Sequence, residues 1–522
     1  MDKLYDEIEE IETSIEAVET RLYNIKQEKI SGDNVYQFLL FFDKLYDRFT
    51  DMEKKTFMKS FIEEVNIYET EQEDGRILRS LKFRFPVFLT IRNYTNLIGT
   101  TKVQLRHYSF GNEEWNMVRQ YLYTEQAHLM CPNMNFGIVC EVNSPFDEHR
   151  IRYTLSLLVK AHPFLSALLG YEEDTKRYYY NITSDSQVDL IVMDENITGL
   201  YDKLVISEYE RLVSTDWNLT CEGMLKIVCW KHENKLCILF VFHHLLADGR
   251  AALSLVKEFA EYYVHGNLPE NVEEKLISSV DDFPSGSELP FISKILVDSA
   301  NKRWKKENHL VSYEEYHDFA SKYLQKDKVV HNTFVYNEET MRTIRSLCKE
   351  NKVSVNDYLT AKMFEEDKTD KIIIACDLRK QLHSYSQGAL GNYSTAFSVR
   401  LKGKSSDTMI TAREVHKQVQ KIMRTSASLY LILQCYARLS SSLIDAAAIS
   451  TLGDFDSKAG KFIGTAFFGF GSPTGYSITN LGKIESSSID NAIFIPPASP
   501  AIKKIKGILT VNGRMNICVS QR

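Results

Sequence analysis

The residues of this sequence best suited to chemistry are two adjacent histidines, His243 and His244, followed after three apolar residues by Asp248 and Gly249. A neutral imidazole accepts a proton from a hydroxyl or amine near neutral pH when a neighbouring group fixes its tautomer and orientation. We therefore take His244 as the candidate general base. Asp248 could orient the imidazole or act as a structural anion paired with a distant arginine, and the spacing leaves both roles open. Gly249 would let a backbone or a ligand approach closely.

Two other interpretations fit the same residues. Two hydrogen-bonded core histidines beside a helix-capping Asp248 would give this pattern without any catalytic role. A metal site is less favoured, because no third or fourth ligand stands at a recognisable spacing from the histidines. The motif by itself therefore leaves the catalytic and the core interpretations open.

The surrounding residues predict a strand, a turn and a helix. Residues 225–242 contain two apolar runs separated by the polar residues 231–234, a pattern typical of two paired strands. After Gly249, apolar residues recur at helical spacing as far as Gly266. The two histidines are therefore expected at the end of a strand, directly before a helix.

The stretch His243-His244-Leu245-Leu246-Ala247-Asp248-Gly249 resembles the H-H-x-x-x-D-G signature of the CoA-dependent acyltransferase superfamily. That superfamily includes chloramphenicol acetyltransferases, alcohol acetyltransferases and the condensation domains of nonribosomal peptide synthetases. Further segments resemble its motifs in the same order, and the resemblance covers roughly residues 105–522. These segments are His162-Pro163-Phe164-Leu165, Val353-Ser354-Val355-Asn356-Asp357, Asp377-Leu378-Arg379, Gly391-Asn392 and Thr479-Asn480-Leu481-Gly482.

The resemblance implies an α/β (α+β) architecture of two chloramphenicol-acetyltransferase-like lobes, each a mixed sheet with helices. It implies acyl transfer from a CoA or phosphopantetheine thioester to a small alcohol or amine acceptor, with His244 as general base. The supporting residues would be His243, Asp248, Gly249 and Arg379. In the superfamily, the arginine that matches Arg379 pairs with the aspartate that matches Asp248, which would make Asp248 structural. Neither a metal nor a bound prosthetic group is implied, since acyl-CoA or acyl-phosphopantetheine would be a co-substrate.

The expected domains are an N-terminal lobe at 105–290 and a C-terminal lobe at 320–522. Residues 267–330 resemble a linker with one helix. Within the second lobe, helices are predicted at 338–350, 355–366, 408–425 and 427–444, and a hairpin with an Asn-Gly turn at 507–519. The chain ends directly after this hairpin, where many members of the superfamily carry a further helix, which would fit a truncated end.

Residues 4–25 carry apolar side chains at alternating steps of four and three, which predicts a short coiled coil and would allow self-association. A single amphipathic surface helix is the alternative. A second helix is predicted near 35–48, and a third from Thr50 with Phe57, Phe61 and Val65 on one face. The alternating residues 77–85 predict a strand.

The segment 1–90 resembles the C-terminal end of large serine recombinases, through its residues 42–55, 73–78 and 82–87. The catalytic serine domain of those enzymes and the cysteines of their zinc ribbon are missing, because the first cysteine is Cys131. Recombination is therefore not expected. A gene fusion or mis-joined reading frame would account for this segment, and a self-associating arm is the functional alternative. The rival to an enzyme is thus a catalytically inactive acyltransferase fold or a coiled-coil interaction protein.

The composition is that of ordinary globular material, with 44% hydrophobic and 25% charged residues among 522. The net charge of −7 gives no basic excess of the kind that nucleic-acid binders show. No apolar run has the length of a membrane helix, and the acidic N-terminus is unlike a signal peptide, so a cytoplasmic location is expected. The nine cysteines include no C-x-x-C pair, which favours reduced, mostly buried thiols.

Overall fold

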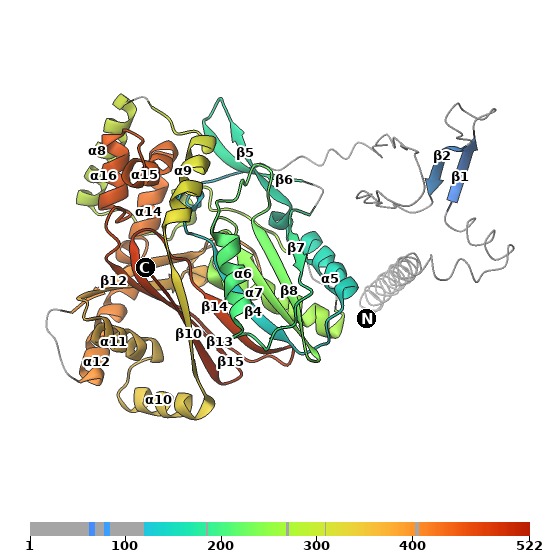
Figure 1. The fold of residues 1–522 in the computed structure, drawn as a ribbon. Helices are drawn as coiled ribbons and strands as arrows, with labels where there is room; N and C mark the ends of the chain where they lie inside the picture. Colours follow the sequence, from blue (N-terminus) through green and yellow to red (C-terminus); the bar gives the residue numbers. More distant parts are fainter. Residues whose placement is uncertain are drawn as a thin grey trace, which may run out of the picture. The chain divides into compact units, whose positions relative to one another are not determined.

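The structure is a computed structural model (Figure 1). The residues it describes are 62–67, 78–83, 119–183, 186–267, 271–307, 309–401 and 407–522. By the contacts between its residues the chain divides into two units, 1–112 and 113–522. The predicted coiled coil at 4–25, with the self-association through it, and the predicted helix at 35–48 lie outside the described residues.

In the first unit the structure describes two strands, β1 (Ile62–Ile67) and β2 (Leu78–Phe83), which pair in antiparallel fashion. The strand predicted at 77–85 is confirmed by β2. The predicted third helix is wrong at its end, because Val65 lies in β1, opposite Leu81. Ile62, Val65 and Ile67 are β-branched and therefore favour a strand once a partner strand is available.

The second unit contains a five-stranded mixed sheet, in the order β14-β4-β9-β8-β7. Its strands are β4 (Phe136–Val142), β7 (Asp189–Val192), β8 (Leu225–His232), β9 (Lys235–Phe242) and β14 (Ile489–Ile495). Strands β8 and β9 form the predicted hairpin, and Glu233 in its turn has a positive φ of 49°. Helix α7 (Gly249–His265) packs on β4, and α6 (Lys203–Val213) packs on β9. A separate three-stranded sheet contains β3 (Gln120–Tyr121), β5 (Ala167–Glu172) and β6 (Arg177–Ile182).

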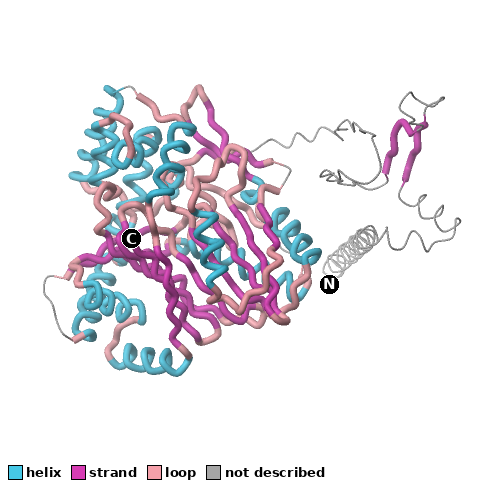
Figure 2. Tube along the Cα trace, in the orientation of Figure 1, coloured by secondary structure: helices cyan, strands magenta, loops and turns pink. Residues whose placement is uncertain are grey.

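A six-stranded mixed sheet has the order β10-β16-β15-β13-β11-β12. In the second unit the strands lie in the middle and helices lie around them (Figure 2). The strands of the six-stranded sheet are β10 (Val330–Tyr336), β11 (Lys371–Asp377), β12 (Ser394–Arg400), β13 (Gly475–Ile484), β15 (Ile502–Val511) and β16 (Arg514–Gln521). The predicted helices are confirmed as α10 (Glu338–Glu350), α11 (Val355–Asp367) and α12 (Thr408–Met423). The predicted Asn-Gly hairpin is also confirmed, since Asn512 and Gly513 both have positive φ angles between β15 and β16.

Two predictions about helical segments are wrong, one for residues 267–330 and one for residues 427–444. The proposed linker at 267–330 contains two helices, α8 (Phe291–Glu307) and α9 (Tyr313–Lys326), where one was expected. Both are mostly polar, and each buries only a narrow stripe, such as Val297, Ala300 and Trp304 in α8. The single helix expected at 427–444 is broken into α13 (Ser426–Leu429), α14 (Leu431–Arg438) and α15 (Ser441–Leu452). Helix α15 is buried almost all round and packs on α16 (Lys458–Ala466), so its axis is set by the core.

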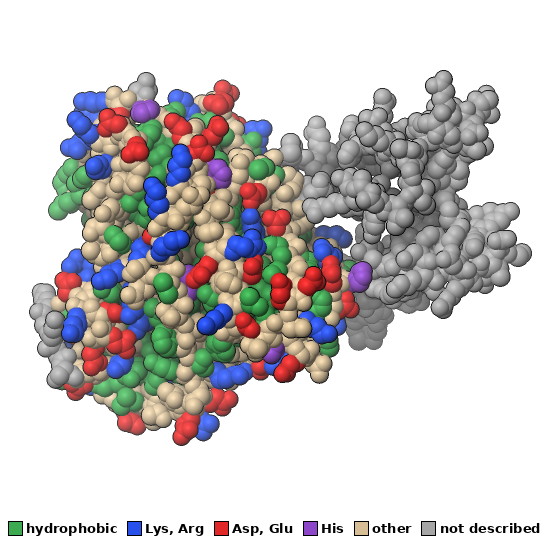
Figure 3. Space-filling model, viewed as in Figure 1, with side chains coloured by type: hydrophobic (Ala, Val, Ile, Leu, Met, Phe, Trp, Pro, Cys, Tyr) green, Lys and Arg blue, Asp and Glu red, His purple; other side chains and the backbone are tan. Residues whose placement is uncertain are grey.

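The outer face drawn in Figure 3 carries Lys and Arg side chains interspersed with Asp and Glu. Within the described residues, none of the helices combines the length and the apolar character needed to span a bilayer. The nine cysteines are free thiols, seven of them buried, as the composition indicated.

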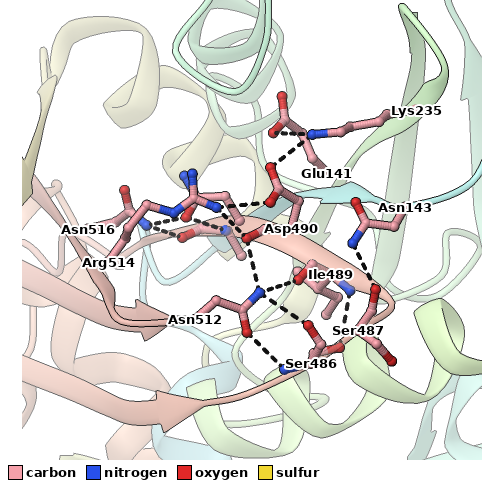
Figure 4. Close-up of polar contacts among 12 residues, drawn as sticks. Glu141, Asn143, Lys235, Ser486, Ser487, Ile489, Asp490, Asn512, Arg514 and Asn516 are labelled. Atoms are coloured by element: carbon pink, nitrogen blue, oxygen red, sulfur yellow. Dashed lines mark hydrogen bonds and ion pairs between the residues drawn. The ribbon is translucent and has the colours of Figure 1, made fainter. Parts of the chain in front are cut away.

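Strand β14 ties the two large sheets together, because it follows β13 in the chain but pairs with β4 of the five-stranded sheet. Figure 4 shows how its first residues are held. The Asp490 carboxylate accepts hydrogen bonds from Nζ of Lys235 in β9, at 2.8 Å, and from Nη2 of Arg514 in β16, at 3.0 Å. The Asn512 side chain donates to the carbonyl oxygens of Ser486, Ile489 and Asp490. One strand from the range 320–522 thus completes a sheet of the range 105–290.

Candidate active site

The two histidines follow β9 in a short turn, residues 243–249, which we call the histidine turn. His243 is buried, and its Nδ1 accepts a hydrogen bond from the backbone N–H of Leu245 at 3.1 Å. Burial, together with the neighbouring His244, lowers the pKa of His243 to about 3, so its ring is neutral. His243 therefore fits the interpretation of a hydrogen-bonded core histidine.

His244 is only partly buried, and its Nδ1 lies 2.9 Å from Oδ1 of Asn392. The amide nitrogen of Asn392 donates to the carbonyl oxygens of His244 and Leu245, at 2.8 and 3.1 Å, which turns Oδ1 toward the ring. Because Oδ1 only accepts, His244 must carry its proton on Nδ1. Its Nε2 then carries an unshared lone pair and no proton, which is the state that a general base requires.

Electrostatics also favour a neutral His244. Burial lowers its pKa below the ordinary value, and this outweighs the opposite effects of its own backbone, Asp248 and Asn392. The His244 ring is therefore neutral at neutral pH, and its Nε2 can accept a proton.

Asp248 closes the histidine turn through an ion pair with Arg379. Asp248 Oδ1 lies 2.6 Å from Arg379 Nη2 and also accepts from the backbone N–H groups of Arg250 and Ala251, at the start of α7. Its Oδ2 accepts from the backbone N–H of Tyr393 at 2.9 Å. Burial would raise the pKa of Asp248, but Arg379 and the backbone donors hold it below the ordinary value. The contact implied by the resemblance is confirmed, and Asp248 is at once a helix cap and a buried anion.

The residues that contact the histidine turn come from one segment, residues 377–393, which connects β11 to β12. We call this segment the bracing loop, and these residues are Arg379, Asn392 and Tyr393. The loop is closed by a hydrogen bond from Leu378 N–H to the Tyr393 carbonyl oxygen at 2.9 Å. Arg379 also contacts Asp377, with 2.9 Å between Nη1 and Oδ1, and the Tyr393 ring lies 5.2 Å from its guanidinium carbon. The backbone N–H of Asp248 donates to the Gly391 carbonyl oxygen at 3.0 Å, so the loop and the turn are joined by main chain as well as side chains.

A second set of contacts, centred on His162 and Glu274, also holds the bracing loop. The fully buried His162 ring lies between Glu274, 2.8 Å from its Nδ1, and Glu258, 2.8 Å from its Nε2. Burial would lower its pKa, but the two carboxylates raise the pKa to about 9. The same Glu274 accepts from the backbone N–H of Leu390 in the bracing loop at 3.0 Å. His162, noted in the sequence as part of a helix ending, thus supports the loop that carries Asn392.

Gly249 occupies a tight position at the start of α7. A Cβ atom there would lie 2.7 Å from Leu481 Cδ2 and 3.4 Å from Phe494 Cζ. The glycine lets the first turn of α7 approach β13 and β14 closely. The residues named from the sequence are therefore brought together: His243, His244, Asp248 and Gly249 in one turn, and Arg379 against it.

Sequence reasoning missed the role of Asn392 and missed His128 altogether. Gly391-Asn392 was matched only as a motif, without a function for the side chain. His128 lies in the one-turn helix α4 (Gln126–Leu129), and its ring stacks on that of His244, with 4.4 Å between centroids and 12° between planes. No pattern in so short a helix marks one histidine as part of a site.

No three His, Cys, Asp or Glu side chains lie together as metal ligands in the described parts of the chain. The site is instead a pair of stacked imidazoles with an amide, an ion pair and backbone around them. Such a set of groups can move protons and donate hydrogen bonds.

Comparison with known families identifies the fold. The model of the Condensation domain family matches residues 119–446, which is more than half of the chain. The chain belongs to the condensation-domain family. Condensation domains are acyl-transferring enzymes, and the matched range contains the histidine turn and the bracing loop.

The individual relatives are distant from this condensation domain. Surfactin synthase subunit 1 of Bacillus subtilis (strain 168) is 27% identical over 139 residues, which are 26% of this chain and 4% of that protein. This chain therefore matches only a small part of the synthase's length. The epimerization domain from the third module of tyrocidine synthetase B is 13% identical, covering 78% of this chain and 91% of that one with a TM-score of 0.48. Polyketide synthase associated protein 5 from Mycobacterium tuberculosis is 13% identical, covering 78% and 93% with a TM-score of 0.47.

Proposed function

We propose that this condensation domain transfers an acyl group from a CoA or phosphopantetheine thioester to an alcohol or amine, with His244 as general base. The observation that carries the proposal is the hydrogen bond between His244 and Asn392. It leaves Nε2 unprotonated in a ring that is neutral at pH 7 and still partly accessible. A histidine kept only for packing, such as His243, has no need of an accessible bare nitrogen.

In the proposed reaction the acceptor's O–H or N–H gives its proton to His244 Nε2 while the oxygen or nitrogen bonds to the thioester carbonyl carbon. Collapse of the tetrahedral intermediate breaks the C–S bond. The imidazolium then returns its proton to the departing thiolate, and His244 ends neutral. No covalent enzyme intermediate is needed. Asp248 and Arg379 serve this reaction by holding the histidine turn in place.

We also propose that residues 105–290 and 320–522 are two lobes of one catalytic unit. The pairing of β14 with β4 supports a single unit, because the sheet whose strand β9 leads into His243 includes a strand from the second range. Under this proposal residues 1–90 take no part in the chemistry, and self-association is their candidate role.

The test compares the wild type with His244→Ala on a panel of acyl-CoA thioesters, from acetyl to octanoyl, with primary alcohols and amines as acceptors. A general base contributes roughly 10²–10⁴-fold, so we expect His244→Ala to lower the transfer rate by about that factor without loss of stability. His149→Ala removes an exposed histidine of α5 (Glu148–Ala161) and serves as the control that keeps the wild-type rate. Equal rates for His244→Ala and the wild type would refute the proposed function.

A further inference from the structure

The ring of His128 faces His244 but has no role in the reaction described so far. It stacks on the His244 ring and keeps partial solvent exposure, as the His244 ring does. Its Nδ1 is buried and has no hydrogen-bond partner among the described residues. A buried polar atom without a partner costs free energy, and a catalytic role is one of the explanations for such an atom.

The unpartnered Nδ1 determines where the His128 proton lies. A proton on Nδ1 would be a buried donor without an acceptor, and orphaned buried N–H groups are rarer than under-used acceptors. The proton therefore belongs on Nε2. Burial, and then the nearby rings of His244 and His243, hold the pKa of His128 well below the ordinary value, so the ring is neutral and has this single donor.

The two stacked rings thus have opposite tautomers. His244 carries its proton on Nδ1, toward Asn392, and leaves Nε2 bare. His128 leaves Nδ1 bare and carries its proton on Nε2. No described residue hydrogen-bonds to the Nε2 atom of either ring, and neither Nε2 atom is fully buried. Both Nε2 atoms therefore lie at accessible edges of their rings. An accessible proton acceptor and an accessible proton donor therefore belong to two rings that stack on each other.

Acyl transfer requires this combination. When the acceptor attacks the thioester, the carbonyl π electrons move to the oxygen, which becomes an oxyanion while the acceptor's proton passes to the base. A hydrogen-bond donor fixed beside the base stabilises that charge as it develops. A reacting carbonyl placed against both rings would find the base at one Nε2 and the donor at the other.

We propose that His128 is a catalytic residue whose Nε2–H donates a hydrogen bond to the carbonyl oxygen of the thioester as it becomes the oxyanion. The proposal rests on the acyl transfer proposed above and supplies its missing donor. The hydrogen bond weakens again when the oxyanion collapses, the C–S bond breaks and the proton held by His244 passes to the thiolate. His128 itself gains and loses no proton over the cycle.

The surroundings of α4 hold the donor in place before the substrate arrives. Gln126 Nε2 donates to Asp445 Oδ1 at 2.5 Å, and both side chains are buried. Burial raises the pKa of Asp445 to about 8, so this pair brings no net charge to the site at pH 7. The backbone N–H of His128 donates to the Glu125 carbonyl oxygen at 2.8 Å. A donor fixed in this way needs little reorganisation in the transition state.

The first test compares His128→Phe with His128→Gln in the full chain. Phenylalanine keeps a ring for the stack but has no donor, whereas glutamine supplies an amide N–H close to the position of Nε2. We expect His128→Phe to lower kcat by roughly 10²–10³-fold with little change in KM for octanoyl-CoA. His128→Gln should recover most of that loss. If His128→Phe is as fast as the wild type while His244→Ala is inactive, this proposal fails and the proposed function stands.

The second test does not depend on activity. In protein labelled with [¹⁵N]histidine, long-range ¹H–¹⁵N spectra at pH 7 report which ring nitrogen carries the proton, and His128→Phe identifies the His128 signals. We expect a neutral ring protonated on Nε2. A ring protonated on Nδ1, or on both nitrogens, would overturn the proposal whether or not the protein transfers acyl groups. If instead His244→Ala transfers as fast as the wild type, the proposed function fails, and the catalytic role of His128 fails with it.

Discussion

The histidine turn and the bracing loop build one site by different means. The turn brings the proposed base, the anion and the glycine from seven consecutive residues, 243–249, between a buried strand and a helix. The bracing loop carries no proposed base, yet it determines the state of the turn's side chains. Asn392 fixes the tautomer of His244, and Arg379 neutralises Asp248.

The difference shows that the chemical group and the control of that group can come from distant parts of a chain. His244 and Asn392 are 148 residues apart in sequence, and Asp248 and Arg379 are 131 apart. Damage to the loop should therefore alter the turn without removing any reacting atom. The following predictions test this division, from the largest expected effect to the smallest.

The largest effect is expected from breaking the ion pair between the two regions. Asparagine at 248 still caps α7, since Asn and Asp are similar N-caps, so Asp248→Asn removes mainly the charge. It leaves the buried Arg379 guanidinium facing a neutral amide. We expect a loss of about 3–5 kcal/mol in the free energy of unfolding, and Arg379→Ala should lose a similar amount. Chemical denaturation of the single and double variants measures both losses.

The double variant shows whether the pair is direct, because contacting residues give losses well below the sum of the single losses. Arg250→Ala is the matched control: its guanidinium contacts Asp377 at 3.6 Å, but its side chain is 47% exposed. An exposed pair of this kind contributes less than about 1 kcal/mol. Additive losses for Asp248→Asn and Arg379→Ala would show that turn and loop are braced by other contacts.

The contrast between the two regions also explains what could be predicted from the sequence. The apolar runs at 225–242 and the helical spacing after Gly249 are local patterns, and they place the histidine turn correctly. The pairing of Arg379 with Asp248 came from the family resemblance, because nothing local links positions so far apart. The stack of His128 on His244 depends on where a four-residue helix lies in the folded chain, which no periodicity encodes.

The errors in the fold have a similar origin. Helices α8 and α9 bury narrow stripes under a polar majority, so composition suggested a linker at 267–330. In residues 427–444 the apolar pattern continues through Leu439, where the chain leaves one helix and starts another against α16. In each case the deciding contact is tertiary, and the local sequence is compatible with more than one outcome.

A smaller effect is expected from removing the amide that fixes the tautomer of His244. Asn392→Ala deletes one hydrogen bond to the ring and two to the turn's carbonyl groups. We expect roughly a tenfold lower kcat/KM, in line with about 1–1.5 kcal/mol for such a bond. The wild-type rate should fall only when the pH drops below the ordinary imidazole pKa of about 6.5, because the pKa of His244 is lowered.

The pH profile distinguishes this positioning role from general damage to the fold. The bond to Asn392 raises the pKa of His244, so Asn392→Ala should move the acidic limb of the rate to still lower pH. Asn392→Asp places a carboxylate beside Nδ1 and should move that limb to higher pH. Rates that fall in both variants without either shift would mean that Asn392 serves only the fold of the bracing loop.

The smallest effect is expected at Gly249, where the histidine turn meets β13 and β14. A new Cβ would lie 2.7 Å from Leu481 Cδ2, but that atom ends a flexible side chain and can move aside. Alanine also favours the helix over glycine by up to about 1 kcal/mol, which offsets part of the clash. We therefore expect Gly249→Ala to change the free energy of unfolding by less than about 1 kcal/mol.

Gly249→Val adds two methyl groups against Leu481 and Phe494, so it should cost about 1–3 kcal/mol, as overpacking does. A thermal-denaturation series of the two variants separates these outcomes, and a loss in Gly249→Ala as large as that of Asp248→Asn would show that close packing braces the turn as strongly as the ion pair does.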